Sequence, residues 1–231
     1  MLMKKIGLVG GIGPASTVDY YLGLIERCRA EFGKNVYPEI VIDSVSLTTA
    51  TDFFAQNNFD GNAKLMLKSL ADLKAAGAEV AAITANTEHI VWDKIKDFFE
   101  IPVVSIVEAT AAEILQKGYK RVLILGTIFT MKSGLYEKPL AERGITPIIP
   151  TDDDKDRISN LFFPNLENGI VVPEDKVKML EIVGRYVREK SADAVLLGCT
   201  ELPLMIKDGD LDVPLLNTTQ IHINAIFDAA K

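Results

Sequence analysis

The sequence predicts an α/β fold with two related lobes, and three observations carry that prediction. Short β-branched runs alternate with longer amphipathic stretches along all 231 residues. Most of these runs are apolar throughout, which is typical of strands buried on both faces of a parallel sheet. A weak internal repeat relates residues 77–88 to residues 191–201. Two lobes would explain the repeat, although two parallel strands of similar composition would also produce it.

The predicted elements alternate in order along the chain. Strands are expected at 4–10, 39–45, 78–84, 102–106, 121–126, 192–198 and 213–216. Helices are expected at 18–29, 62–76, 107–117, 132–143 and 174–190, and glycines stop three of them, at Gly77, Gly118 and Gly144. The acidic run 152–154 predicts a solvated turn or helix start rather than a metal site.

Charge and cysteine content exclude several classes of function. The net charge is −7 and no block of Lys or Arg occurs, so neither nucleic acid nor an anionic membrane is expected as a partner. No apolar run is long enough for a signal peptide core or a membrane span, which predicts a cytoplasmic protein. The two cysteines, Cys28 and Cys199, form no close pair, which excludes a disulfide framework and a zinc or redox motif. Cys28 lies in the helical pattern Val18, Leu22, Ile25 and Arg29, where inert packing is expected.

A glycine-rich stretch at 10–17 (GGIGPAST) connects the first strand to the first helix. A glycine turn that leads into a helix N-terminus is a general anion site, and Gly11 would let the backbone approach a carboxylate. Ser16 or Thr17 is expected to cap the helix. The third glycine of a dinucleotide fingerprint is missing, so no nucleotide cofactor is expected. A simple tight turn is the alternative.

Two further polar clusters follow predicted strands. Asn86 and Thr87 could hold a carboxylate or an amino group, or could simply cap a helix, and the neighbouring His89 is expected to be a structural hydrogen-bonding partner. Hydroxyls at Thr127, Thr130 and Ser133 could bind an acidic ligand, since capping explains one of them but not three. Ligands of open α/β sheets bind at the carboxyl ends of strands, where both clusters lie.

The fourth cluster, GCTELP at 198–203, places Cys199 at a strand end beside Thr200 and Glu201. A thiol near a helix N-terminus can have its pKa lowered and serve as a base or nucleophile. Cys199 is therefore the expected chemical centre, with a structural cysteine as the alternative.

Taken together, these motifs resemble those of one family. GGIGPAST, ANTEH, GTIFT, GCTELP and TTQIH occur in the order and spacing of the cofactor-independent aspartate/glutamate racemases, within the Asp/Glu/hydantoin racemase superfamily, over essentially the whole chain. The resemblance implies two pseudosymmetric lobes, each a mostly parallel sheet flanked by helices, usually in a homodimer. It also implies an amino-acid or dicarboxylate substrate between the lobes, with neither pyridoxal phosphate nor metal. The expected lobes are 1–100 plus 209–231, and 101–208.

The same resemblance assigns roles to individual residues. Cys199 matches one of the two family cysteines that flank the substrate's α-carbon and act as acid and base. Glu201 and His222 would tune its thiol. The groups expected to bind substrate are Gly11, Asn86, Thr87, Thr127, Thr130 and Thr200.

Ala85 stands where the family has its first cysteine, and this departure rules out symmetric two-thiol racemisation because alanine carries no proton. Thr84, Glu88, His89 or a bound water could act instead, although Thr84 need not face the site. A single-cysteine lyase or decarboxylase and a catalytically silent amino-acid-binding protein are the alternatives. An engineered alanine would look the same.

Overall fold

The computed structural model describes residues 3–162, 164–166 and 169–231, and it divides into two compact units. Unit 1 comprises Met1–Ala109 and Thr219–Lys231, and unit 2 comprises Thr110–Thr218. The sequence-based limits of 1–100 plus 209–231 and 101–208 stay a prediction.

Unit 1 contains a four-stranded parallel sheet in the order β2-β1-β3-β4. Its strands are β1 (Ile6–Gly10), β2 (Ile40–Ser44), β3 (Val80–Ile83) and β4 (Val103–Val104). The helices between them are α1 (Pro14–Phe32), α2 (Leu47–Ala55), α3 (Phe59–Ala75), η1 (Thr87–Val91), α4 (Trp92–Ile95) and η2 (Lys96–Phe98). Most of α11 (Thr218–Ala230) also belongs to this unit.

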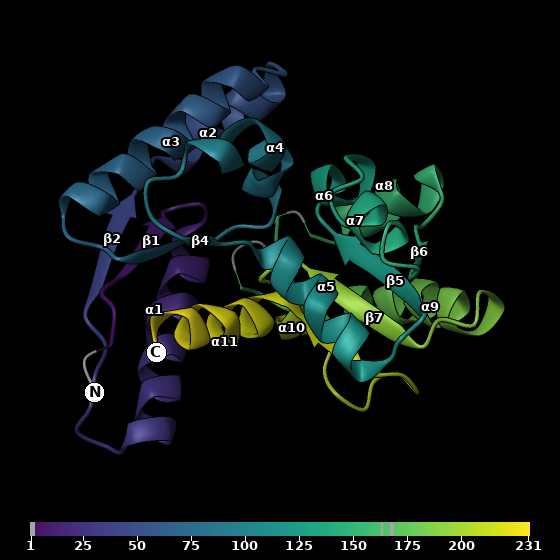
Figure 1. The fold of residues 1–231 in the computed structure, drawn as a ribbon. Coiled ribbons are helices and arrows are strands. Elements are labelled where there is room, and N and C mark those ends of the chain that lie inside the picture. The colour runs from purple at the N-terminus through teal and green to yellow at the C-terminus, as the bar shows by residue number, and fades with distance from the viewer. Residues whose placement is uncertain (1–2, 163, 167–168) are drawn as a thin grey trace. The chain divides into compact units, whose positions relative to one another are not determined.

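Helices cover both faces of this sheet (Figure 1). On one face, α3 and α4 pack against β1 and β3 through Met66, Leu70 and Ile95. On the other face, α1 and α11 pack against the same strands through Tyr20 and Phe227. Because side chains alternate along a strand, β1 and β3 contribute apolar residues to both clusters, as their continuous hydrophobic runs predict.

Unit 2 repeats this architecture. Its parallel sheet has the order β6-β5-β7-β8. The strands are β5 (Arg121–Gly126), β6 (Thr146–Ile148), β7 (Ala194–Gly198) and β8 (Leu215–Asn217). The helices are α5 (Ile106–Lys117), which starts in unit 1, and α6 (Ile128–Lys132), α7 (Glu137–Ala141), α8 (Asp152–Asn160), α9 (Pro173–Glu189) and α10 (Leu202–Met205). The predicted fold class, two helix-flanked parallel sheets, is confirmed.

The internal repeat corresponds to equivalent strands, since β3 and β7 occupy the same place in their sheets. Each is preceded by a residue of positive φ, Gly77 or Ser191. Each also begins beside a carboxylate that accepts a backbone N–H from a neighbouring segment. Glu79 accepts the N–H of Lys5, and Asp193 accepts that of Arg121. These shared details support a genuine repeat rather than similar composition alone.

Several element boundaries differ from the predictions. Strand β6 was not expected, because it is three residues long, contains Pro147 and lies at a sheet edge. The single helix predicted at 132–143 is wrong, since Gly134, with φ of 73°, separates α6 from α7. The acidic run 152–154 forms the first turn of α8, as predicted, with Thr151 as its N-cap. It is not fully solvated as expected, because Asp154 is buried and pairs with Arg185.

Candidate functional site

The carboxyl ends of β5 and β7 lie side by side in unit 2. Gly126 pairs with Gly198 in the parallel ladder, so Thr127 and Cys199 leave the sheet at neighbouring positions. A Cβ on Gly126 would lie 2.8 Å from the Thr130 methyl, and one on Gly198 would lie 2.8 Å from the Leu125 carbonyl. The two glycines therefore allow the first turn of α6 to pack directly on the strand ends.

Cys199 is half-buried, and its thiol has a defined partner. Its Sγ donates to Oε2 of Glu201 at 2.8 Å, and the Thr200 hydroxyl donates to the same oxygen at 2.9 Å. The backbone N–H groups of Thr200 and Glu201 act to lower the pKa of the thiol, but less than burial and the Glu201 carboxylate raise it. The turn after β7 thus joins a proton donor to a carboxylate acceptor within three consecutive residues.

The expectation of a lowered thiol pKa is wrong. Burial, followed by the negative charge of Glu201, raises the pKa of Cys199 well above its ordinary value. Helix α10 has only four residues and starts after Glu201, so it provides little positive potential to oppose this effect. The resting centre is a neutral thiol bonded to a carboxylate.

The three hydroxyls after β5 have different positions. Thr127 caps α6 by accepting the backbone N–H of Thr130 at 3.2 Å, and its Oγ1 lies 3.2 Å from the Thr130 hydroxyl. Thr130 is buried, whereas Ser133 is exposed and bonds to the local backbone. Thr127 and Thr130 therefore form one polar pair next to the cysteine's strand, and this pair also caps the helix.

In unit 1 the equivalent edge holds the glycine-rich turn. Gly11 has φ of 86°, and a Cβ there would lie 2.1 Å from the Val45 carbonyl, so only glycine fits. The predicted cap of α1 by Ser16 or Thr17 is wrong, because Gly13 is the N-cap and no side chain caps the helix. Thr17 instead accepts the Gly11 N–H at 2.8 Å, and Ser16 donates to the Thr84 carbonyl at 2.9 Å. Both hydroxyls hold the turn closed.

The segment after β3 carries Asn86 and Thr87. Asn86 is buried and precedes η1 without making a side-chain capping bond, so capping does not account for it. Thr84 is fully buried and donates to the Val9 carbonyl at 2.9 Å, which fixes the end of β3 against β1. Ala85 packs partly buried against the cluster that contains Met66 and Ile83.

Both histidines are buried and neutral. His89 Nδ1 donates to the Ala85 carbonyl at 2.9 Å, while its Nε2 accepts the Ile106 N–H at 3.3 Å. His222 Nε2 donates to the Val104 carbonyl at 2.9 Å, and its Nδ1 lies 2.8 Å from the Tyr20 hydroxyl. Burial lowers the pKa of His89 to about 4 and that of His222 to about 3. The structural role predicted for His89 agrees with these bonds, and both ring nitrogens of His222 are occupied within unit 1.

Glu88 is the residue whose environment the sequence did not reveal. It is 1% exposed, and its Oε2 accepts the Asn62 amide at 2.6 Å. Burial raises its pKa to about 7. In the sequence, a glutamate at this place is an ordinary acid in the first turn of a helix, so only the packing of α3 over it could disclose its burial.

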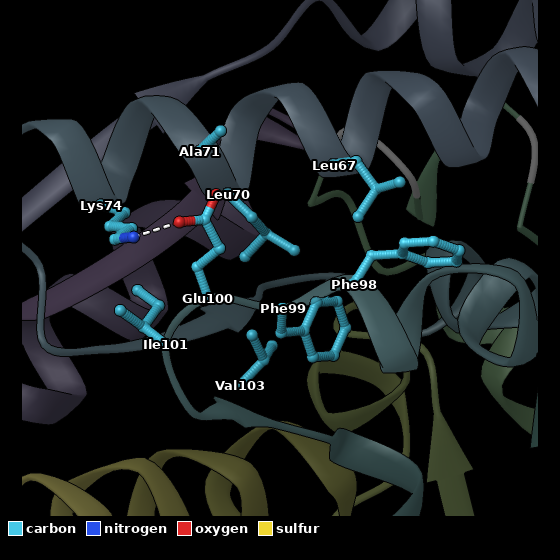
Figure 2. Close-up of a pocket in the computed structure, with 9 residues that line it drawn as sticks. All are labelled: Leu67, Leu70, Ala71, Lys74, Phe98, Phe99, Glu100, Ile101 and Val103. Atoms are coloured by element: carbon cyan, nitrogen blue, oxygen red, sulfur yellow. Dashed lines mark hydrogen bonds and ion pairs between the residues drawn. The ribbon is translucent and has the colours of Figure 1, made fainter.

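A pocket of about 210 Å³ also lies in unit 1, between α3 and the segment that leads into β4 (Figure 2). Its walls are mainly apolar, and the ion pair between Lys74 and Glu100 lies at its edge. Lys74 precedes β3, so this pocket lies toward the amino ends of the strands. Asn86 and Thr87 lie at the carboxyl ends, which makes the pocket separate from the candidate site.

The described part of the chain offers neither a metal cluster nor a membrane span. Within residues 3–162, 164–166 and 169–231, no group of three His, Cys, Asp or Glu side chains could hold a metal ion. None of the helices in the described ranges is both long and apolar enough to cross a membrane.

The architecture and the cysteine turn define an α/β protein with a thiol hydrogen-bonded to a carboxylate at a strand end. Residues 9–226 match the Asp/Glu/Hydantoin racemase family, so the chain belongs to that family. Family membership places it among the amino-acid racemases, which are isomerases.

Individual relatives agree with this assignment. The chain is 24% identical over 222 residues to the broad specificity amino-acid racemase RacX of Bacillus subtilis, covering 93% of this chain and 92% of the relative. Its sequence is 37% identical to that of an aspartate racemase homologue from Pyrococcus horikoshii. The crystal structure of that protein superposes with a TM-score of 0.87, with 99% of each chain covered. A putative Asp/Glu racemase from Yersinia pestis is 31% identical, with a TM-score of 0.92 and 99% of each chain covered.

Proposed function

We propose that the chain exchanges the α-proton of an amino acid, aspartate, glutamate or a close analogue, with Cys199 as the acid/base and without pyridoxal phosphate or metal. The observation that carries this proposal is the 2.8 Å bond between the Cys199 thiol and the Glu201 carboxylate at the end of β7. A thiol that is neutral at rest can protonate a carbanion directly. To act as a base it first gives its proton to Glu201, and the resulting thiolate then takes the proton from the α-carbon.

The remaining predicted residues have binding and supporting roles in this proposal. Substrate carboxylates and amine are bound by the backbone at Gly11 and by polar groups of Asn86, Thr87, Thr127, Thr130 and Thr200. Thr84 and His222 support the substrate-binding groups of unit 1. The bonds of Thr84 fix the end of β3, and those of His222 fix helix α11.

Racemisation also needs a proton donor on the opposite face, and Ala85 supplies none. A single thiol that removes and returns the proton from one face would give exchange without inversion. The alanine therefore favours a second candidate function, a lyase or decarboxylase in which Cys199 protonates a carbanion from one side only. A catalytically silent amino-acid-binding protein is the third.

Proton NMR in heavy water with L- and D-aspartate and L- and D-glutamate tests these functions. Loss of the α-proton signal with inversion supports a racemase, and loss without inversion supports one-face exchange. Release of carbon dioxide indicates a decarboxylase. Ligand-induced thermal stabilisation with no exchange indicates the binding protein.

A homodimer in the cytoplasm completes the proposal. The outer face of α1 supports self-association, because Val18, Tyr21 and Leu22 are 54%, 43% and 51% exposed at helical spacing. Val18 and Leu22 belong to the apolar pattern that the sequence predicts for this helix, and the structure leaves both outside the core. Two free cysteines fit a reducing compartment. Sedimentation of the wild type and of Leu22→Lys tests the dimer, which the lysine is expected to weaken.

A further inference from the structure

Two buried side chains, Glu88 and His89, fix the segment that follows β3. His89 bonds to the Ala85 carbonyl and to the Ile106 N–H, and Glu88 bonds to Asn62 in the first turn of α3. Asn86 and Thr87, the proposed substrate-binding groups, immediately precede these two anchors. Any loosening of an anchor would therefore displace the binding groups.

The pairing between Glu88 and Asn62 is incomplete if Glu88 is ionised. Asn62 is fully buried, and its Nδ2 donates to Glu88 Oε2, whereas its Oδ1 has no hydrogen-bond partner among the described residues. A carboxylate only accepts, so it cannot satisfy this oxygen. A carboxylic acid can, because it accepts one bond from the amide and donates its O–H to the amide oxygen.

No cation among the described residues lies against this carboxyl group to stabilise its charge. The titratable groups of the elements packed on η1 pair with one another at the surface, Lys94 with Asp60, Lys68 with Asp72, and Asp93 with Lys96. Lys74 pairs with Glu100, Lys64 is exposed, and His89 is neutral. Only burial and the Asn62 bond affect the pKa of Glu88, and burial dominates.

We propose that Glu88 is a positioning residue, which in its protonated form makes a reciprocal pair with Asn62 and thereby holds Asn86 and Thr87 for substrate binding. Ionisation leaves the Asn62 oxygen without a donor and places an unpaired charge at a side chain that is almost fully buried. The segment at 86–89 then loosens, and substrate binding weakens as pH rises through neutrality. This inference rests on the proposed function for its effect on substrate, but not for its effect on the segment.

Steady-state kinetics across pH 5.5–9 test the effect on substrate, with the wild type, Glu88→Gln and the exposed-site control Glu181→Gln. Glutamine keeps an amide pair with Asn62 and cannot ionise. If only the protonated form binds, KM of the wild type rises about tenfold one pH unit above the midpoint, with a smaller change in kcat. We expect Glu88→Gln to lose this rise and Glu181→Gln to keep it. The same KM profile in the wild type and Glu88→Gln would overturn the proposal.

Hydrogen exchange tests the effect on the segment without any need for activity. The ratio of amide exchange rates between the wild type and Glu88→Gln at residues 86–89 cancels the intrinsic pH dependence. We expect this ratio to rise between pH 6 and pH 8.5, while the amides of β7 show no change. A constant ratio would reject the positioning role even in an active enzyme. A rising ratio in a protein that exchanges no substrate would reject the proposed function and keep the inference.

Discussion

The end of β3 in unit 1 and the end of β7 in unit 2 are equivalent points of one repeated architecture, yet they carry different chemistry. Ala85 and Cys199 occupy matching places in the repeat, and each is followed by Thr and Glu within three residues. Glu201 accepts a hydrogen bond from the thiol, whereas the matching Glu88 is buried against Asn62. The glutamate thus bonds to a thiol in one unit and to a buried amide in the other. Burial and the available neighbour, rather than residue type, decide the role of each glutamate.

Removing the thiol should have the largest effect. In Cys199→Ala, α-proton exchange is expected to fall by about 10³-fold or more, because the proposed acid/base group is then missing. NMR exchange rates measure the loss. Cys28→Ala removes the other cysteine, which is buried in the unit 1 core, and serves as the matched control. Equal rates for wild type and Cys199→Ala would remove Cys199 from the chemistry.

Replacing the carboxylate of Glu201 should have the second-largest effect on the exchange rate. Glu201→Gln keeps the shape of the turn but cannot take the thiol proton, so the exchange rate should fall by about 10²-fold. The remaining activity should also depend more steeply on pH, since hydroxide must then remove the proton. Glu88→Gln at the equivalent position should leave this rate at pH 6 nearly unchanged. Similar losses in the two variants would contradict the different roles of the two glutamates.

A cysteine introduced at residue 85 should increase inversion of the substrate. Ala85→Cys places a second thiol at the position equivalent to Cys199, and we expect inversion of the substrate to increase by about tenfold relative to exchange. Chiral chromatography of the product measures inversion. Ala85→Ser has similar size but a much less acidic hydroxyl, and it should show no such gain. A decarboxylase would show no inversion in either variant.

Glycine substitution compares the packing at the ends of β5 and β1, the equivalent central strands of the two sheets. Gly126→Ala would bring a Cβ to 2.8 Å from the Thr130 methyl, and Gly10→Ala would bring one to 2.5 Å from the Thr17 methyl. Each change should lower the free energy of unfolding by about 1–3 kcal/mol. Denaturant unfolding measures this. Thr130→Ser should recover part of the loss in Gly126→Ala but none in Gly10→Ala, and equal recovery in both would refute the packing argument.

The smallest effect concerns pH and the buried histidines. The lowered pKa of His222 means that its contribution to stability is fully present above the unfolded value of about 6.5 and is lost as pH falls toward 3. His222→Gln should therefore cost more stability at pH 7.5 than at pH 4.5, by about 1–2 kcal/mol. Urea midpoints of both proteins at both pH values give the difference, and an equal cost at the two values would contradict a neutral buried imidazole.

Local pattern predicted most of the fold, because buried parallel strands have an unmistakable apolar signature. Strand β6 was not predicted, because three residues at a sheet edge that include a proline do not form a continuous apolar run. At the site, Cys199 and Glu201 could be recognised by their place after β7. Glu88 could not be understood in the same way, because its burial depends on α3, a helix that lies well before it in the sequence. The thiol pKa was mispredicted for a related reason, since the sequence shows a nearby helix but not that the helix is too short to matter.

The bond between Cys199 and Glu201 also affects how the enzyme would withstand oxidants. Peroxides and alkylating agents attack the thiolate far faster than the neutral thiol. A sulfur that keeps its proton reacts correspondingly slowly with such reagents. The burial and the neighbouring carboxylate that raise the pKa of Cys199 are therefore expected to slow irreversible modification of the sulfur.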